Sequence, residues 1–221
     1  MDYFGVKEPE LVKTVRTQVK DIEIRETPGV NRNISLKEAW NLMQQANVVT
    51  LAAVTEGGLL EGLITVGDIT KSYMNVYDSS ILSKAETQYS NIVETLEGDL
   101  VIGDIQAYFN RGKVLIAAAN PDMMEFYIEP SDLVILGNRY ESQLCAIEME
   151  ASCIIVCEGA GVSMTIKKLA QERGCTIITT PYDTYTAARL INQSMPISYF
   201  MKTEHLITFE DTDYIDEVKK V

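Results

Sequence analysis

The sequence has little histidine and no long apolar run. Its 221 residues include one histidine, His205, whereas hydrolytic metal sites and nucleophile systems with a Ser/His or Cys/His pair usually use several. Most hydrolase chemistries are therefore disfavoured, and we expect no catalytic site and no metal site in this chain. No apolar stretch reaches the roughly 18 residues that cross a bilayer, and no apolar segment follows a basic start. Both absences predict that the chain has no membrane partner.

Cysteine and basic residues are also scarce. The four cysteines lack the CxxC spacing and partner histidines of a zinc site, which predicts reduced core residues and a cytoplasmic protein. They are Cys145, Cys153, Cys157 and Cys175. Lysine and arginine number 19 against 32 aspartates and glutamates, a formal charge of −13. Such a surface repels DNA, so we expect no nucleic-acid partner. A helix N-terminus with a nearby lysine or hydroxyl still allows a small anionic ligand.

The first third of the chain alternates helix and strand signals. Residues 1–19 are predicted to form a lead-in helix, because aliphatic residues recur there near helical spacing. Ser35 followed by Glu38 is a capping box, which predicts a helix from residue 35 to about 46. Short apolar strands at 48–54 and 59–65 flank a glycine turn, and a helix at about 69–76 follows. So small a unit buries its apolar faces poorly, so we expect it to pair with a second copy.

The middle of the chain has the pattern of an α/β domain. Residues 78–98 are polar and helical in tendency, which predicts a linker. From 99 to 193, strands rich in Val and Ile alternate with helices, which is typical of a buried, mostly parallel sheet. The strands are expected at 113–119, 132–136, 152–157 and 176–179, and the helices at 121–127, 140–149, 163–173 and 184–193.

Residues 194–221 form a last segment, with a loop through Asp211 and a helix that starts at Asp213. The sequence ends inside this amphipathic helix, which predicts that it is a fragment of a longer protein.

Thr65 and Asp68 bring a hydroxyl and a carboxylate to a strand-to-helix junction. Thr65 and the N–H groups of a helix start can bind phosphate, and Asp68 can accept hydrogen bonds from both hydroxyls of a ribose. For an isolated Thr-x-x-Asp, capping of the helix is the more common role. Here, however, residues 20–77 as a whole resemble a CBS motif, whose paired copies bind AMP, ADP, ATP or related adenosine ligands. The resemblance assigns phosphate and ribose contacts to Thr65 and Asp68.

The segment from Ile197 to Val221 is similar to the opening loop and first helix of a second CBS motif, without its strands and last helix. We expect the adenine base in an apolar slot near Val49 and the loop of Asn33. The resemblance puts Lys202 where its loop could approach a polyphosphate. A solvated lysine without a ligand is an equal alternative for Lys202.

Residues 99–193 resemble the DRTGG domain, so the chain is expected to be a CBS module interrupted by an α/β DRTGG domain. Asn138-Arg139 stands where that family has Asp-Arg, and Cys157-Glu158 where it has Thr-Gly. Thr180-Pro181-Tyr182-Asp183-Thr184 also matches. We expect Arg139 and Asp183 to form a structural ion pair or a dimer contact rather than a catalytic site.

A DRTGG domain between two CBS motifs resembles the regulatory insert of family II inorganic pyrophosphatases. Residues 2–11 are similar to the catalytic-domain stretch that precedes this insert. The resemblance implies a homodimer that AMP or ADP inhibits and ATP or a diadenosine polyphosphate activates. It also implies that a covalently linked catalytic domain, with manganese or cobalt and with magnesium, hydrolyses diphosphate outside this sequence.

Two other functions remain open from the sequence. DRTGG domains also occur beside phosphotransacetylase domains, but an acyl- or phosphoryl-transfer enzyme needs a phosphate loop or a nucleophile with its base. The sequence has neither G-x-x-x-x-G-K-[ST] nor G-x-S-x-G. A structural dimerisation module that has lost its ligand also fits.

Overall fold

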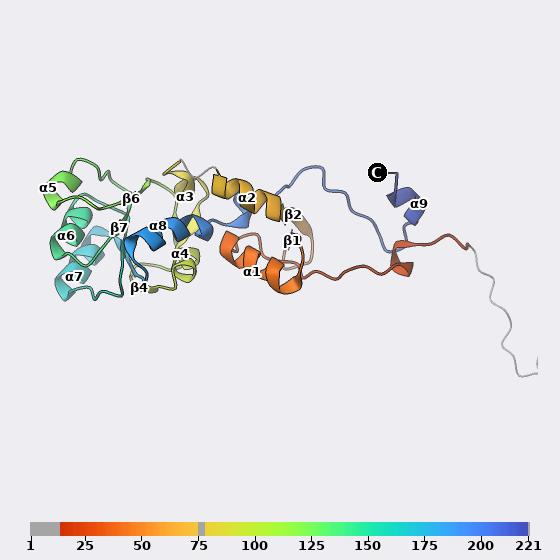
Figure 1. The fold of residues 1–221 in the computed structure, drawn as a ribbon, viewed down its shortest axis with the longest axis horizontal. Helices are drawn as coiled ribbons and strands as arrows, with labels where there is room; N and C mark the ends of the chain where they lie inside the picture. The colour runs from red at the N-terminus through yellow and green to blue at the C-terminus, as the bar shows by residue number, and fades with distance from the viewer. Residues whose placement is uncertain (1–13, 75–77, 221) are drawn as a thin grey trace, which may run out of the picture. The chain divides into compact units, whose positions relative to one another are not determined.

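The computed structural model describes residues 14–74 and 78–220. The chain divides into two compact units. The larger unit is Thr27–Glu204, and the smaller one consists of Met1–Glu26 with His205–Val221. The larger unit contains the elements of the first motif and of the α/β domain (Figure 1).

The first motif of the larger unit follows the order that the sequence predicts. Its elements are α1 (Leu36–Ala46), β1 (Thr50–Val54), β2 (Leu60–Thr65) and α2 (Val66–Met74). Ser35 caps α1, because its hydroxyl accepts a hydrogen bond of 3.0 Å from the Glu38 N–H. β1 and β2 are antiparallel, and Thr50 lies opposite Thr65. The start of α2 is therefore next to the start of β1.

The segment at residues 78–98 is folded and packed, which differs from the expected linker. It contains α3 (Ile81–Lys84), β3 (Thr87–Gln88) and α4 (Tyr89–Thr95). β3 pairs with β5 (Tyr108–Phe109). Leu82, Ile92 and Leu96 are fully buried. The sequence analysis did not predict this packing, because polar residues separate the few buried apolar residues and the segment has no strong apolar periodicity.

The α/β domain has a five-stranded sheet in the order β4-β9-β8-β7-β6. Its elements are β4 (Asp99–Ile102), β6 (Val114–Ile116), α5 (Pro121–Met124), β7 (Leu133–Leu136), α6 (Tyr140–Glu148), β8 (Cys153–Val156), α7 (Met164–Arg173), β9 (Thr176–Thr179) and α8 (Thr184–Leu190). The four strands β6 to β9 are parallel, as predicted, and β4 is antiparallel to β9. The mostly parallel α/β sheet is confirmed, and the antiparallel edge strand β4 is an addition to it.

The two faces of this sheet belong to different parts of the core. Val134 and Ile154 pack with the helices α5, α6 and α7. Ile135 and Ile155 face the other way and share one buried cluster with α4, α8 and the first motif. Because this cluster is continuous, the first motif and the α/β domain form one body.

The smaller unit contains two short helices, η2 (Val19–Asp21) and α9 (Ile215–Val218). Residues 14–17 have no helical structure, and Val15 is 96% exposed. Within the expected lead-in helix, residues 14–18 are therefore not helical, Val19 begins η2, and residues 1–13 lie outside the described residues. Backbone pairing with the C-terminal segment replaces it, because Gln18 bridges Tyr214 and Val19 N–H donates to Asp213 O at 2.9 Å.

The pairing in the smaller unit repeats a pairing in the larger one. Gln18 precedes η2 and bridges Tyr214, which precedes α9. In the larger unit, Pro196 precedes η4 (Ile197–Tyr199) and bridges Ser35, which precedes α1. Both bridges are antiparallel. This repeat agrees with the resemblance of the C-terminal segment to the opening of a second motif.

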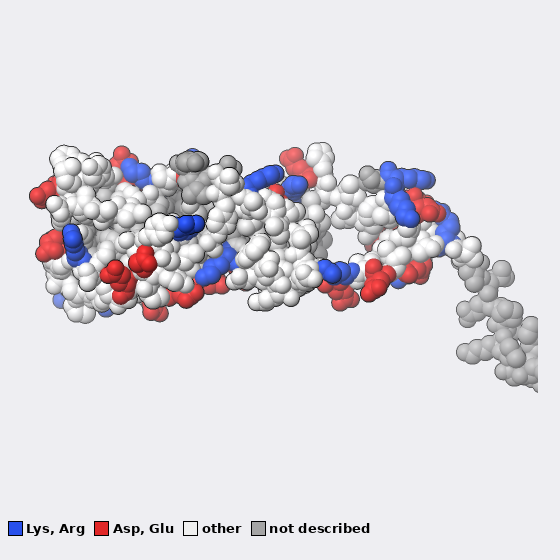
Figure 2. Space-filling model, in the orientation of Figure 1, with Lys and Arg blue, Asp and Glu red and all other residues white. Residues whose placement is uncertain are grey.

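Most charged side chains lie on the surface, and most of the cysteines are buried. On the face drawn in Figure 2, the described lysines and arginines lie in small groups among acidic and uncharged side chains. The four cysteines are free, and all but Cys145 are buried. None of the described helices has the length and apolarity to cross a membrane.

The packing of residues 78–98 gives a first prediction. Ile92→Ala should lower the free energy of unfolding by about 2–5 kcal/mol, because Ile92 is fully buried in the shared core. The exposed neighbour Glu94→Ala is the control and should change it by less than about 0.5 kcal/mol. Denaturant unfolding of both variants measures the difference, and equal stabilities would mean that the segment is a linker after all.

Candidate functional site

Thr65 and Asp68 form a reciprocal hydrogen-bonded pair at the start of α2. The Thr65 hydroxyl donates to Asp68 Oδ2 at 2.6 Å, and the Thr65 backbone N–H donates to the same oxygen at 3.0 Å. The Asp68 N–H donates back to Thr65 Oγ1 at 3.2 Å. This arrangement is a capping box with aspartate at the third helical position. It fixes both side chains, and Asp68 is only 9% exposed.

The pair leaves hydrogen-bonding capacity for a ligand. No described residue donates to the second carboxylate oxygen, Asp68 Oδ1. A carboxylate oxygen accepts hydrogen bonds from vicinal hydroxyls, and the N-terminus of a helix attracts anions. The local geometry can therefore serve both as a cap and as a contact for a ribose and a phosphate.

Val49 lies beside this pair. Its carbonyl oxygen accepts a hydrogen bond of 3.0 Å from the N–H of Val66, the first residue of α2. The Val49 side chain is 70% exposed. It offers an apolar surface next to Thr65.

Lys202 lies against β2 close to the same point. Lys202 and Leu63 exchange two backbone hydrogen bonds of 2.9 Å each, and Leu63 is two residues before Thr65. The Lys202 side chain is exposed. We refer to residues 195–202 as the strap, because they run from the bridge with Ser35 to the bridge with β2. The strap adds a wall from the segment that follows the DRTGG domain to the candidate site.

Asn33 lies at the opposite end of the hairpin. Its neighbour Arg32 forms an ion pair of 3.1 Å with Glu61, which is four residues before Thr65, roughly 13 Å along an extended strand. The Asn33 carbonyl accepts a hydrogen bond of 2.9 Å from Asn91 of α4. The structure therefore does not place Asn33 with the other four candidate residues. The structure brings the other four together at the start of α2. They are Val49, Thr65, Asp68 and Lys202.

Gly62 is a residue of this site that the sequence analysis missed. A Cβ atom on Gly62 would lie 2.8 Å from Met201 Sδ and 2.9 Å from the carbonyl oxygen of Lys202. Only glycine lets the strap approach β2 so closely. A glycine inside a strand pattern signals such a close approach, so its position in the run from Leu60 to Thr65 was the available signal.

The loops at the carboxyl ends of the sheet strands show no catalytic arrangement. Asp183 caps α8, because its carboxylate accepts hydrogen bonds from the N–H and hydroxyl of Thr186. The expected ion pair between Asp183 and Arg139 is not formed among the described residues. Burial raises the pKa of the Cys157 thiol to about 12, so this cysteine is a poor nucleophile at neutral pH.

The fold and this site define a CBS motif joined to a DRTGG domain. The CBS domain family matches residues 19–75, and the DRTGG domain family matches residues 91–194. The second match begins within α4, so this helix belongs to the domain rather than to a linker.

Two pyrophosphatases are similar to the whole chain. The cobalt-dependent inorganic pyrophosphatase of Clostridium perfringens is 35% identical over 99% of the chain. A Thermotoga maritima protein named probable manganese-dependent inorganic pyrophosphatase is 25% identical over 100% of it. In both cases the chain spans 40% of the length of the relative.

A solved structure is similar over nearly the same range. It contains the CBS and DRTGG domains of the regulatory region of Clostridium perfringens pyrophosphatase in complex with an activator, diadenosine tetraphosphate. The TM-score is 0.87 at 34% identity, and the match covers 93% of this chain and 89% of that one. The chain therefore belongs to the family of CBS–DRTGG regulatory regions of inorganic pyrophosphatases.

The close approach at Gly62 gives a second prediction. Gly62→Ala should separate the strap from β2, because the new methyl group meets the Lys202 carbonyl. We expect the amide protons of Leu63 and Lys202 to lose protection in hydrogen exchange, and stability to fall by about 1–3 kcal/mol. Gly57→Ala in the hairpin turn is the matched control, since its Cβ would meet only Thr55 Oγ1 at 3.7 Å. Unchanged protection in Gly62→Ala would contradict the proposed close contact.

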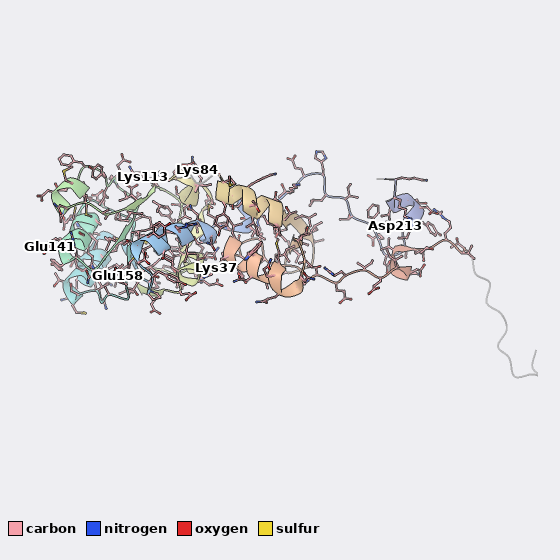
Figure 3. The ribbon with its side chains drawn as sticks, in the orientation of Figure 1. Lys37, Lys84, Lys113, Glu141, Glu158 and Asp213 are labelled. Atoms are coloured by element: carbon pink, nitrogen blue, oxygen red, sulfur yellow. The ribbon has the colours of Figure 1, made fainter. Side chains whose placement is uncertain are left out.

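The loop after β8 gives a third prediction. Glu158 has a φ of 65°, in the left-handed region, at a position where the DRTGG family has glycine. Glu158→Gly should raise the free energy of unfolding by about 0.5–1 kcal/mol, because the strain of a side chain there outweighs the entropy lost by glycine. Glu141→Gly within α6 should instead lower it by about 1 kcal/mol. Figure 3 labels Glu158 and Glu141. Thermal unfolding of the two variants tests whether the free energy of unfolding changes with opposite signs.

Proposed function

We propose that this chain is the adenine-nucleotide-binding regulatory region of a metal-dependent inorganic pyrophosphatase that hydrolyses diphosphate to two phosphates. The observation that carries the proposal is the similarity over 93% of the chain to a regulatory region that binds the activator diadenosine tetraphosphate. The catalytic activity would belong to the rest of a longer protein. Four free cysteines suit the reducing cytoplasm, where we place it.

The ligand would bind at the end of the β1–β2 hairpin. Asp68 Oδ1 would accept hydrogen bonds from the ribose, and the N-terminus of α2 with Thr65 would hold a phosphate. The adenine would lie on the exposed Val49 side chain. The strap would present Lys202 to the phosphate chain, where a cation is worth most for a ligand of high negative charge.

Regulation would follow from unequal affinity for two arrangements of a homodimer. A ligand that binds both arrangements equally shifts neither, so each nucleotide class must prefer one of them. We propose that AMP and ADP favour the less active arrangement. ATP or a diadenosine polyphosphate would favour the more active one.

The metal ions of the reaction would be held outside this chain. Within the described residues, no group of three or more His, Cys, Asp or Glu is placed to hold a metal ion. The two relatives are named as cobalt-dependent and manganese-dependent enzymes. We therefore assign manganese or cobalt, and magnesium, to the catalytic domain of the longer protein.

The main alternative is a dimerisation module without a ligand. The reciprocal bonds between Thr65 and Asp68 favour it, because they satisfy a helix start even when no nucleotide is present. The two functions differ in what the loss of Asp68 would change.

Asp68→Ala tests this difference. Calorimetric titration with diadenosine tetraphosphate should give an affinity at least about tenfold weaker than in the unchanged chain, because hydrogen bonds to a charged group are lost. Stability should also fall by about 1 kcal/mol, the usual loss for a helix cap.

Ser35→Ala is the control, since Ser35 is the N-cap of α1 and its loss also weakens a helix start, away from the candidate site. It should lose a similar stability and keep its nucleotide affinity. Equal affinities in the two variants would favour the dimerisation module.

A further inference from the structure

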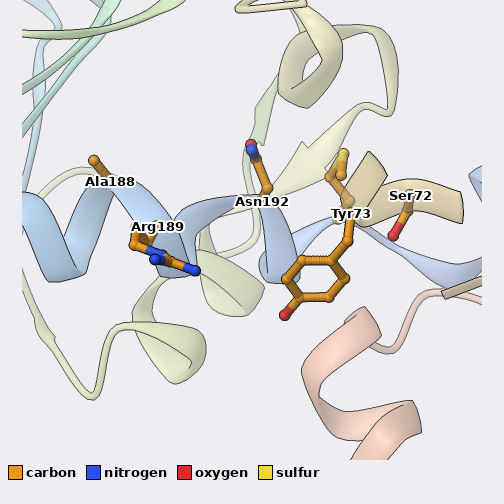
Figure 4. A pocket seen from close by; sticks show the side chains of 6 residues that line it. Ser72, Tyr73, Ala188, Arg189 and Asn192 are labelled. Carbon is orange, nitrogen blue, oxygen red and sulfur yellow. The ribbon is translucent and has the colours of Figure 1, made fainter. Parts of the chain in front are cut away.

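A pocket lies where the first motif meets the DRTGG domain, within the larger unit. Its six lining residues come from α2, α8 and the segment that follows α8 (Figure 4). They are Ser72, Tyr73, Ala188, Arg189, Asn192 and Met195. The volume is about 300 Å³, at the lower end of the range for small-molecule sites. None of the residues of the candidate nucleotide site lines it.

Three side chains with hydrogen-bond donors left free by the described residues line this pocket, and the carboxamide of one of them, Asn192, points away from the other two in Figure 4. The donor groups are the guanidinium of Arg189, the hydroxyl of Tyr73 and the carboxamide of Asn192. In Figure 4 the Arg189 and Tyr73 side chains point toward each other from opposite walls. Among the described residues, the Arg189 guanidinium makes one hydrogen bond, in which Nη1 donates to the Tyr185 hydroxyl at 3.1 Å. The remaining N–H groups can bind an oxyanion in a forked geometry.

The charge in the pocket is positive although the protein is acidic. No aspartate or glutamate is among the six lining residues, while the whole chain carries a formal charge of −13. Burial raises the pKa of Tyr73 on the opposite wall, and the positive charge of Arg189 partly offsets this rise. A cation without a carboxylate partner is suited to an anionic ligand.

The rest of the wall is mostly apolar, and its one further polar group, the Ser72 hydroxyl, donates to the Ile69 carbonyl at 2.6 Å. Ala188, Met195 and the ring of Tyr73 leave more room than an oxyanion group alone would fill. A ligand that fits both parts has one phosphate or carboxylate group on a small apolar or aromatic body. We propose that this pocket binds a small organic anion of that kind, with its oxyanion group on Arg189 and Tyr73.

Binding there would connect two parts of the fold. Tyr73 is eight residues after Thr65, roughly 12 Å along α2, and Arg189 and Asn192 belong to the DRTGG side. An anion held by Tyr73 and Arg189 would fasten α2 to the DRTGG domain. This proposal does not depend on the nucleotide site, although both sites share α2.

Titration of the full chain with phenyl phosphate, benzoate and inorganic phosphate tests the proposal. We expect phenyl phosphate or benzoate to bind more tightly than inorganic phosphate, because only they have an apolar body. The stronger of the two identifies the preferred oxyanion. Absence of binding by both organic probes would overturn the proposal.

Variants separate this pocket from general charge effects and from the nucleotide site. Arg189→Gln and Tyr73→Phe should each weaken binding of the stronger probe, the first by at least about tenfold. Arg173→Gln removes the same charge from α7, where Arg173 pairs with Glu148, and should leave the affinity within twofold. Asp68→Ala should also leave it within twofold. Binding that survives Arg189→Gln, or that Asp68→Ala abolishes, would contradict the proposed pocket.

Discussion

The two backbone hydrogen bonds between Leu63 and Lys202 are the contact on which the candidate site depends. They join the strap, which follows the DRTGG domain in the sequence, to the strand that ends at Thr65. Without them, Thr65 and Asp68 would be an ordinary helix cap at the end of a two-stranded hairpin. The contact requires a residue without a side chain at position 62, because Met201 and the Lys202 carbonyl occupy the space that a Cβ atom would need. One glycine in β2 therefore determines whether the strap can lie against the strand that carries Thr65.

The strap also connects this site to the DRTGG domain. It follows η3 (Ile191–Ser194), whose Ile191 is buried in the same cluster as Leu36 of α1 and Ile135 of β7. On the other side, Lys37 reaches from α1 to α4 and donates to the Thr95 carbonyl at 2.9 Å (Figure 3). A close-packed core that extends across both domains does not deform locally at low cost. A ligand that moves the strap would therefore be expected to act on the sheet as well, which is a physical route for regulation.

The sequence predicted those parts of the fold that local signals determine. Ser35 and Glu38 set the start of α1, and the apolar runs gave every parallel strand of the sheet to within a few residues. It did not predict the packing of residues 78–98, because tertiary contacts bury Leu82 and Ile92 without a local apolar pattern. Of the candidate site, the sequence motif gave Thr65 and Asp68. Asn33 was grouped with them without a local signal, and the pairing of Val30 with Ala53 carries its loop away from Thr65.

The repeat between the two units bears on the role of Lys202. Counting from the bridge residues, Gln18 and Pro196, the position of Lys202 in the strap corresponds to Ile24 in the smaller unit. The same framework thus has an aliphatic residue in one copy and a cation in the other. Backbone pairing uses the N–H and C=O groups that every residue except proline carries, so it does not require a lysine at this point. The fold therefore does not require the charge of Lys202. A solvated surface lysine and a contact for the anionic ligand proposed above both fit its exposed position two strand residues from Thr65.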